Sequence, residues 1–283
     1  MTEATLQTYL VDGDKGGIGK SLTTRALTHH YLSKEPDKRP VIAVFDADMS
    51  NPDVCGKDGL STKNSNLALT QILDLSIEQG WIDFANAIEK LQNEYDDDDL
   101  CIIVNMPAQI GARAFQGSVP IVAEVLRQCN AFPIWMLSRV EDSIRTLEER
   151  IKSMPTRFQT GLVLRNLFFG EPSKFVLWDN SPLRARMLKD DPNGELYWDE
   201  ACLPEINDNV IASIGRMPFH IALGKNANGK PYLSHGFKLT LDAWLRKTGQ
   251  VFSEMEEFIV HTKSGEAARD YADDIAERIS KNV

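Results

Sequence analysis

The sequence of 283 residues lacks the marks of a secreted or membrane-spanning protein. No apolar run approaches the roughly 20 residues that a membrane-spanning helix needs. The N-terminal M-T-E-A-T lacks the basic and apolar regions of a signal peptide. The four cysteines are widely spaced and form no C-x-x-C pair, so we expect reduced, mostly buried thiols. They are Cys55, Cys101, Cys129 and Cys202. These absences predict a cytoplasmic protein.

Positive charge is also in deficit, with 31 lysines and arginines against 41 aspartates and glutamates and a formal net charge of -10. This balance excludes a surface that binds nucleic acid everywhere, although a local basic patch stays open. The apolar share of 42% suffices for a sizeable core, which argues against disorder. Internal repeats, low-complexity segments and linkers are lacking too, and we therefore expect a single domain over residues 1–283.

What the sequence does contain is a glycine-rich stretch between a strand and a helix. The apolar residues 9–11 predict a buried strand that ends at Asp12, and a helical pattern begins at Lys20 and runs to about Ser33. The intervening loop has glycines at positions 16, 17 and 19, which allow the backbone to turn tightly. Such a loop directs its N–H groups and the positive end of the helix dipole at one point, where an anion binds.

Two side chains add to this predicted phosphate site. Lys20 brings a full positive charge, and the Ser21 hydroxyl is placed for a magnesium ion that bridges the terminal phosphates. Asp14 stands where the ordinary pattern has glycine, and Lys15 is a second lysine ahead of the glycines. A glycine-rich surface turn would not explain the flanking strand and helix, so we predict nucleotide binding. The predicted nucleotide-binding residues of the loop are Lys15, Gly16, Gly17, Ile18, Gly19, Lys20, Ser21 and Leu22.

Polar residues follow two further predicted strands. The apolar run 41–45 ends in D-A-D-M-S-N-P-D, which places Asp46 and Asp48 beside the phosphate loop if the two strands are neighbours. Carboxylates there can hold magnesium through water or orient an attacking water, whereas the alternative is an ordinary turn. The apolar run 100–104 ends at Asn105, whose amide can bond a magnesium-bound water but adds no negative charge.

The rest of the chain alternates helical and strand patterns. We expect helices at 67–91 (with a break near Gly80), 119–129, 141–153 and 239–260, and a last amphipathic stretch at 266–279. Further strands are expected at 132–137, 161–164 and 210–214, with an irregular insert near 168–205. This order predicts an α/β fold, namely a single doubly wound, mostly parallel sheet flanked by helices, of the P-loop NTPase type.

At K-G-G-I-G-K-S the chain resembles the deviant Walker A ATPases of the ParA/MinD family. D-A-D-M-S-N is similar to the family's D-x-D switch, and N-M-P-A-Q-I-G to its second switch, with Asn105 in place of the usual aspartate. V-L-R-N, which ends at Asn166, is similar to a strand whose asparagine contacts adenine. Pro218 and Phe219 are similar to a late segment that packs on the base. The N-M-P-A-Q switch and the irregular insert favour the branch of plasmid stability or conjugation proteins.

The resemblance implies a two-fold symmetric homodimer that encloses ATP and hydrolyses it slowly. Lys15 would reach the partner's phosphates, Lys20 would hold the β- and γ-phosphates, and Asp48 would position the attacking water, so these three are the implied catalytic residues. The implied magnesium-binding residues are Ser21 and, through water, Asp46 and Asn105. Because Asn105 departs from the family's aspartate, the resemblance puts the rate of hydrolysis in doubt more than the binding of ATP.

The resemblance also implies partners, because family members position plasmids, chromosomes or other large cargo on the nucleoid or the membrane. An activating partner protein, such as a small DNA-binding protein, would stimulate hydrolysis. Residues 139–189 carry ten basic against six acidic side chains, which is either ordinary surface charge or a non-specific DNA face. The predicted contacts of that face are Arg184, Arg186 and Lys189. The C-terminal stretch is acidic, so no membrane partner is expected; the chain would be cytoplasmic, and on the nucleoid where it binds DNA.

Three alternatives to an active switch remain at this stage. A nucleotide-binding scaffold or adaptor with little hydrolysis is favoured by Asn105. A metabolic ATP-dependent ligase or amidase shares the loop but needs a substrate pocket that the sequence does not identify. Iron–sulfur relatives need paired cysteines, which are lacking here.

Overall fold

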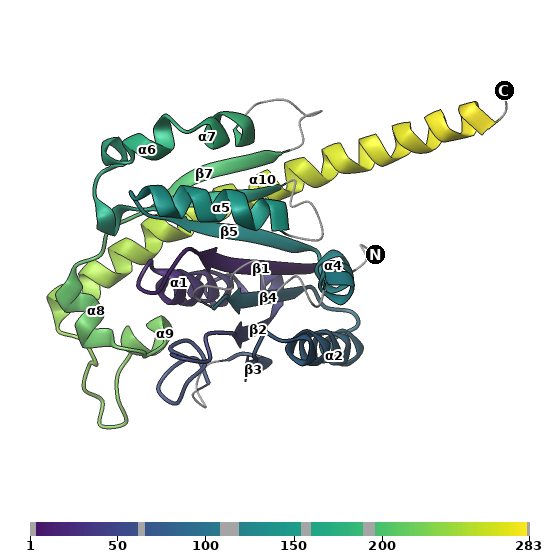
Figure 1. Cartoon of the computed structure of the whole chain (residues 1–283). Helices are drawn as coiled ribbons and strands as arrows, with labels where there is room; N and C mark the ends of the chain where they lie inside the picture. The colour runs from purple at the N-terminus through teal and green to yellow at the C-terminus, as the bar shows by residue number, and fades with distance from the viewer. Residues whose placement is uncertain (1–3, 62–65, 108–118, 154–159, 189–195, 282–283) are drawn as a thin grey trace.

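Seven parallel strands form one sheet in the order β3-β2-β4-β1-β5-β6-β7. Figure 1 shows β3 and β7 toward opposite edges of this sheet. The computed structural model describes residues 4–61, 66–107, 119–153, 160–188 and 196–281, and within 263–281 it describes the backbone alone. The strands are β1 Leu6–Gly13, β2 Val41–Asp46, β3 Leu69–Ile72, β4 Leu100–Asn105, β5 Ala131–Leu137, β6 Thr160–Asn166 and β7 Tyr197–Leu203. The predicted parallel α/β sheet is confirmed. Strands β2 and β4 lie on one side of β1 and β5 on the other, so the strand order reverses at the end of β1, where α/β sheets bind ligands.

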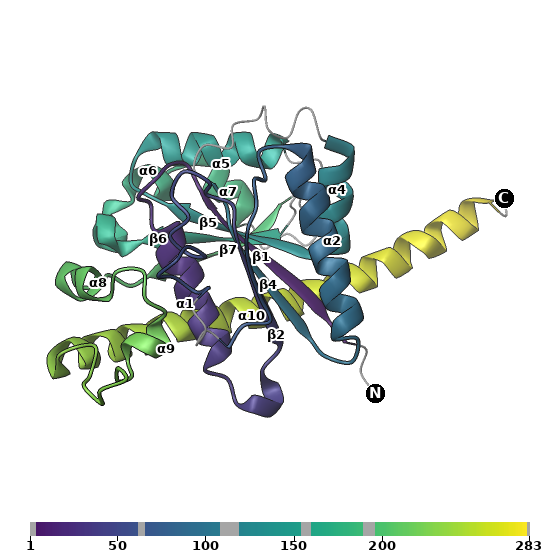
Figure 2. The same cartoon turned by 90° about the horizontal axis from the view of Figure 1, so that it is seen from below.

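Helices cover both faces of the sheet, as the two views in Figure 1 and Figure 2 show. One face packs against α1 Lys20–Leu32, α8 Asp208–Ile214, α9 Phe219–Ala222 and α10 His235–Lys281. The other packs against α2 Glu78–Glu94, α4 Val119–Gln128, α5 Glu141–Ser153, α6 Val176–Asp179 and α7 Pro182–Met187. Short 3-10 helices lie at Pro36–Lys38, Leu167–Phe169 and Pro172–Lys174. Among the described helices, none is long and apolar enough to cross a membrane.

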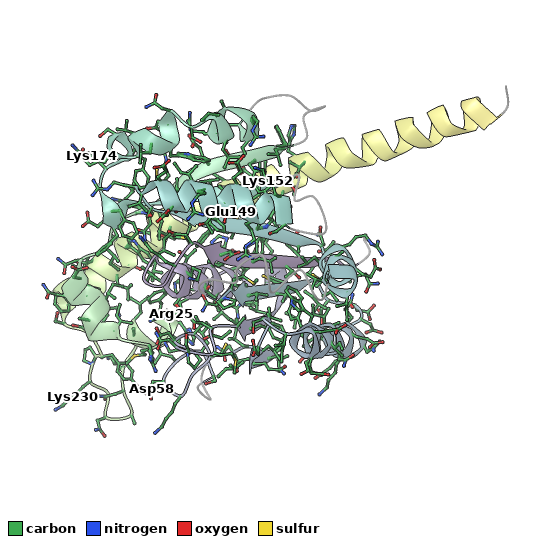
Figure 3. The ribbon with its side chains drawn as sticks, in the orientation of Figure 1. Arg25, Asp58, Glu149, Lys152, Lys174 and Lys230 are labelled. Atoms are coloured by element: carbon green, nitrogen blue, oxygen red, sulfur yellow. The ribbon has the colours of Figure 1, made fainter. Side chains whose placement is uncertain are left out.

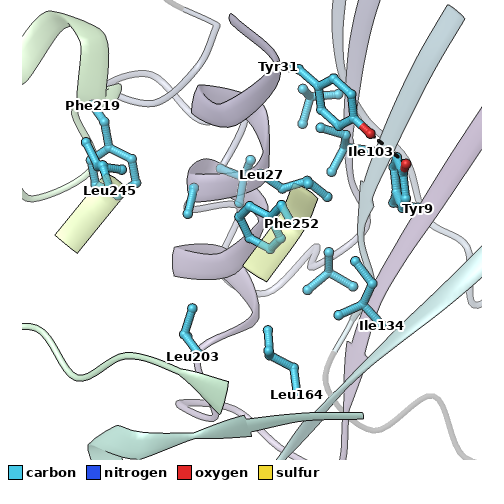
Figure 4. Packing of buried hydrophobic residues seen from close by; sticks show 14 of the residues in the cluster. Tyr9, Leu27, Tyr31, Ile103, Ile134, Leu164, Leu203, Phe219, Leu245 and Phe252 are labelled. Carbon is cyan, nitrogen blue, oxygen red and sulfur yellow. Dashed lines mark hydrogen bonds between the residues drawn. The ribbon is translucent and has the colours of Figure 1, made fainter. Parts of the chain in front are cut away.

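The alternation of side chains along β1 produces two hydrophobic cores. Tyr9 and Val11 point to the face that α1 and α10 cover, whereas Leu10 points to the face of α2, α4 and α5. Figure 4 shows the first core, in which the Tyr9 and Tyr31 hydroxyls lie 2.6 Å apart and Phe252 of α10 packs beside α1. Because α1 is held by both the sheet and α10, the loop that precedes it starts from a rigid base.

The predicted helix over 67–91 is wrong before Glu78. Residues Leu69–Ile72 form β3, which pairs with β2, and α2 begins only at Glu78. Gly80 does not break a helix. It lies in the first turn of α2 against the Asp74 carbonyl, where an added Cβ would come within 1.9 Å of that oxygen. The apolar run alone did not separate a short strand from the helix that follows it.

Two other predictions near the C-terminus are wrong. The run 210–214 is helix α8, because Val210 and Ile214 lie on one buried face and Asn207 caps the helix by accepting from the Asn209 N–H at 2.9 Å. The seventh strand is β7, within the segment expected to be irregular, and it pairs in parallel with β6. The helix expected at 239–260 and the stretch at 266–279 belong to one helix, α10, whose C-terminal part extends away from the sheet in Figure 1.

Candidate nucleotide-binding site

The glycine loop leads from the central strand β1 into α1 through two residues in left-handed backbone conformation. Gly17 has φ 76° and Gly19 has φ 104°, values that side chains larger than glycine disfavour. Gly19 is the N-cap of α1 and supplies no side-chain cap, so the first N–H groups of the helix are left for a ligand. At Gly19 an added Cβ would lie 2.6 Å from Nδ2 of Asn166. The loop therefore has the geometry of an anion cradle.

Two lysines of this loop differ in their surroundings. Lys20 is only 5% exposed, and its ammonium donates to the Lys15 carbonyl at 3.0 Å. Burial lowers the pKa of Lys20, and the carboxylates of Asp12 and Asp48 oppose that shift. The Lys15 side chain is exposed. One cation thus faces the loop interior, while the other is free to contact a second molecule.

The base of the loop is fixed by a buried ion pair that the sequence does not predict. Asp12 accepts from the Gly13 N–H at 2.7 Å and lies 2.9 Å from Nε of Arg150, which comes from α5. A second contact from α5 joins Ser143 to Asp14 at 3.4 Å, and burial raises the pKa of that carboxyl group. In the sequence, the sign of this ion pair is a charged residue at the end of an apolar strand. The partner cannot be found from that sign, because it lies far along the chain.

Asp46 and Asn105 are paired in register on β2 and β4, and both are completely buried. Oδ1 of Asp46 accepts from Nδ2 of Asn105 at 2.8 Å and from the Asp48 N–H at 3.2 Å. Its Oδ2 accepts from the N–H groups of Val54 and Cys55 at 2.9 and 3.1 Å. Four donors use the four acceptor positions of this carboxylate. The structure thus places Asp46 as an anchor of the loop after β2, with no lone pair left for the predicted magnesium-bound water.

The side chains of Asp48 and Ser21 are placed so that they can orient a water and bind magnesium, as predicted. Oδ1 of Asp48 accepts from the Ser50 hydroxyl at 2.7 Å and from the Asn51 N–H at 3.2 Å. In the described part of the chain no hydrogen bond to Oδ2 of Asp48 is found. The negative charge of Asp48 raises the pKa of Lys20, against the effect of burial. Ser21 lies in the first turn of α1, half-buried. A magnesium ion would fit this donor set, because the Ser21 hydroxyl and the phosphate oxygens of a nucleotide would hold it and Asp48 would orient a water.

The residues predicted to contact the base are held within the protein. Nδ2 of Asn166 donates to the Ile18 carbonyl at 2.9 Å, and its Oδ1 accepts from the Phe168 N–H at 3.0 Å. Pro218 is buried, and Phe219 is 1% exposed in the first core. The structure therefore places Asn166 as a support of the phosphate loop and Phe219 as a core residue. In this conformation the Phe219 ring offers no free face to a base.

Arg25 of α1 fastens the turn before α9 to the phosphate-loop helix. Its Nη atoms donate to the carbonyls of Gly215 and Met217 at 2.7 and 2.5 Å, and its guanidinium lies 4.7 Å from the Phe219 ring centroid. Burial lowers its pKa to about 10, and Asp53 opposes the shift. Figure 3 shows Arg25 near the middle of the molecule. This arginine was not predicted, since its partners lie about 190 residues further along the chain.

The adjacent Arg216 holds the loop that carries Asp48. Its Nη2 lies 2.5 Å from Oδ1 of Asp53 and donates to Oδ1 of Asn51 at 3.0 Å. We expect Arg216→Ala to lower kcat for ATP about tenfold, because loosening the loop misplaces Asp48, with little change in nucleotide affinity. Steady-state hydrolysis and binding of a fluorescent ATP analogue measure the two effects. Arg246→Ala, on the exposed face of α10, is the control; equal kcat values in both variants would contradict this role.

The predicted DNA contacts are engaged in ion pairs or lie outside the described residues. Nε of Arg184 donates to Glu200 at 2.9 Å, and this glutamate also accepts from Nε1 of Trp178 at 2.8 Å. Nη2 of Arg186 lies 3.0 Å from Glu148. Lys189 is outside the described residues. DNA binding through the two arginines would have to break these pairs, so the prediction that they form a DNA face gains no support.

A parallel sheet whose central strand runs through a glycine loop into a helix defines the class: the chain has a P-loop NTPase fold. No family model matches the sequence. The chain is similar to Protein MobD of Acidithiobacillus ferrooxidans, with 29% identity over 218 residues, 76% of this chain and 86% of MobD.

Two solved structures extend the comparison. A plasmid partition protein of Borrelia burgdorferi B31 bound to AMPPNP has 13% identity and a TM-score of 0.46, covering 87% of this chain and 98% of that one. A variant of Cyanothece McdA in complex with ATP has 14% identity and a TM-score of 0.42, covering 88% and 97%. The resemblance to deviant Walker A ATPases rests on the loop motif, and the sheet shows the P-loop NTPase fold.

Proposed function

We propose that this chain is an ATP-dependent dimerisation switch with slow ATPase activity. The observation that carries the proposal is the contrast between its two loop lysines. Lys20 is buried and directed into the cradle, whereas Lys15 is exposed at the same loop. The exposed ammonium of Lys15 is suited to contact a nucleotide bound by a second copy of the chain. There it would stabilise negative charge on the phosphates.

Exposed apolar side chains around the loop support a dimer that forms on this face. Val140 follows β5 and Phe168 follows β6, and they are 43% and 55% exposed. Val176 and Leu177 of α6 are 55% and 52% exposed. Phe168 is connected to the loop through Asn166, which donates to the Ile18 carbonyl and accepts from the Phe168 N–H. Apolar area of this kind gains stability when a partner covers it.

Each site residue has a role in the proposed reaction. Lys20 binds the β- and γ-phosphates, Ser21 binds magnesium, and Asp48 orients the attacking water. Magnesium, when bound, neutralises charge that develops on the phosphate oxygens. The partner's copy of Lys15 adds charge as the terminal phosphate leaves. Hydrolysis then removes the contact that holds the two copies together, which makes the dimer reversible.

The proposed work of the switch is to position or segregate DNA, such as a plasmid, or another large cargo. The ATP-bound dimer would bind DNA non-specifically, and an activating protein partner would stimulate hydrolysis.

The proposed switch is tested by removing the charged side chain of Lys15 or of Asp48. We expect Lys15→Ala and Asp48→Ala each to lower steady-state ATP hydrolysis about 100-fold or more, since each removes a group that acts in the transition state. Lys15→Ala should also abolish ATP-dependent dimerisation in light-scattering measurements, whereas Asp48→Ala should accumulate dimer. Lys90→Ala, an exposed lysine of α2, is the matched control. Wild-type rates in both variants would reject the switch.

A nucleotide-binding scaffold with little hydrolysis is the second candidate, and the Asn105–Asp46 hydrogen bond favours it. That bond uses the amide that would otherwise face a magnesium-bound water. Steady-state hydrolysis with and without DNA and a candidate protein partner separates the two candidates. The hydrolysis rate of a switch rises when the partner is added, whereas the hydrolysis rate of a scaffold does not change.

A further inference from the structure

The strands beside the phosphate loop fix the direction in which a bound nucleotide lies across the sheet. Asp48, which orients the attacking water in the proposed function, follows β2, and β2 lies on the β4 side of β1. Because the γ-phosphate faces that water, the α-phosphate and the base extend toward the opposite side of the loop. That side is formed by β5 and β6, and the end of β6 touches the loop at Gly19. The base therefore lies near residues 166–170, the segment that ends β6 and follows it.

The polar side chain of this segment is already hydrogen-bonded within the protein. Nδ2 of Asn166 donates to the Ile18 carbonyl at 2.9 Å, and Oδ1 accepts from the Phe168 N–H at 3.0 Å. Asn166 is also only 4% exposed, so its amide has little surface left for a ligand. The amide thus holds the phosphate loop and is not placed to distinguish one base from another.

The turn before α9, which lies against α1, directs its hydrogen-bond acceptors inward as well. Adenine differs from guanine by an N6 amino group, and a site that selects adenine needs an acceptor for it. The carbonyls of Gly215 and Met217 accept from Arg25, and the Pro218 carbonyl accepts from the Ala222 N–H at 2.9 Å. The charge of the Arg25 guanidinium also disfavours the approach of a second N–H donor to its two carbonyls. The acceptors of this turn therefore serve α1 and α9.

An aromatic ring beside the phosphate loop is exposed to solvent. Phe168 is 55% exposed and lies in the short 3-10 helix Leu167–Phe169, directly after β6. Its backbone is fixed to the loop, because the Phe168 N–H bonds Asn166 and Asn166 bonds Ile18. The ring of Phe169 packs against that of Phe168 with centroids 5.4 Å apart and an interplanar angle of 84°. The Phe168 ring is thus held near the base without being covered by the protein.

We propose that the site holds the base by stacking on Phe168 and does not read its edge, so that its substrates are purine nucleoside triphosphates, with ATP and GTP bound alike. Stacking tolerates either purine, because every base has a π face. Purines bury more apolar area on the ring than the smaller pyrimidines do. Strong selection between bases needs hydrogen bonds that the wrong base leaves unpaired, and here the amide and the carbonyls named above already serve the protein. The inference rests on the proposed function in that a nucleoside triphosphate occupies the cradle.

Calorimetric titration of the full chain with the Mg²⁺ complexes of ATP, GTP, CTP and inorganic tripolyphosphate tests the proposal. Tripolyphosphate supplies the phosphates without a base. Phe168 also belongs to the exposed apolar group of the proposed dimer face, so the titrations use a protein concentration at which light scattering shows a monomer with each ligand. We expect the dissociation constants of ATP and GTP to agree within about fivefold, and CTP to bind more weakly than either.

Variants of Phe168 test the ring itself. Phe168→Ala should weaken ATP and GTP about tenfold each, and Phe168→Trp should retain the wild-type affinity. Tripolyphosphate should bind Phe168→Ala like the wild type, because the backbone N–H that bonds Asn166 is unchanged. Tyr232→Ala is the matched control, since it removes an aromatic ring that is 42% exposed between α9 and α10. This control should bind all four ligands like the wild type.

Four results would overturn the proposal. If ATP binds more than about tenfold more tightly than GTP, the edge of the base is read. If CTP binds as tightly as ATP, the substrates are not restricted to purines. Equal ATP affinity in Phe168→Ala and Tyr232→Ala would show that the base does not stack on Phe168. An equal loss of ATP and tripolyphosphate binding in Phe168→Ala would make Phe168 a support of the loop instead. A wild type that binds neither ATP nor tripolyphosphate would reject the proposed function, and this inference with it.

Discussion

Lys20→Met is expected to lower ATP affinity and ATP hydrolysis, each by about 100-fold or more. The ammonium of Lys20 is the one cation directed into the cradle within the described part of the chain, and its bond to the Lys15 carbonyl holds it there. Methionine has a similar length and fills the same space without the charge. Binding of a fluorescent ATP analogue and steady-state hydrolysis measure the loss.

The same change should leave the fold intact. Burial is the main cause that lowers the pKa of Lys20 from 10.5, so the charged form is disfavoured in the folded protein. Between the lowered value and 10.5 the unfolded chain binds more protons, and wild-type stability therefore rises with pH. Lys20→Met should lack this rise and match the wild type within about 1 kcal/mol at neutral pH. Lys90→Met is the exposed control; a variant that unfolds at neutral pH would contradict the prediction.

Asn105→Asp is expected to cost the nucleotide-free protein about 3–5 kcal/mol at neutral pH. The change replaces a donor 2.8 Å from Oδ1 of Asp46 by a second carboxylate, in a region with no exposure to solvent. Chemical denaturation at fixed pH measures the loss. Asn105 thus has a structural role, because its amide donates to the buried carboxylate of Asp46.

The pH dependence of this variant gives a second check. Two buried carboxyl groups in contact share a proton, so the pKa of one is raised above its unfolded value. A raised pKa gives stability that is present at low pH and is lost as pH rises. The deficit of Asn105→Asp relative to wild type should therefore shrink toward about pH 4 and grow toward about pH 8. Asn86→Asp, exposed on α2, adds the same charge and should show no such trend.

Much of the fold followed from local sequence patterns. The strands around residues 9–11, 41–45 and 100–104 were predicted because each is a short apolar run that ends in polar residues. The errors at 67–91 and 210–214 fell on short apolar runs whose hydrogen-bond partners or packing neighbours are distant. For β3 the partner is β2, and for α8 the deciding contact is with the core below α10. Local periodicity does not contain that information.

The sequence by itself determined the phosphate cradle. Its glycines, lysine and serine, at fixed spacing, place the backbone N–H groups, the positive charge and the hydroxyl group within one short loop. Only the tertiary structure decided what surrounds the cradle. Folding brings Arg150 to Asp12, Asn166 to the Ile18 carbonyl and Asn105 to Asp46. The last two pairs are separated by 148 and 59 residues in the sequence. It also buries Phe219 and pairs Arg184 with Glu200. Those roles depend on which strands become neighbours, and strand order is a property of the whole sheet.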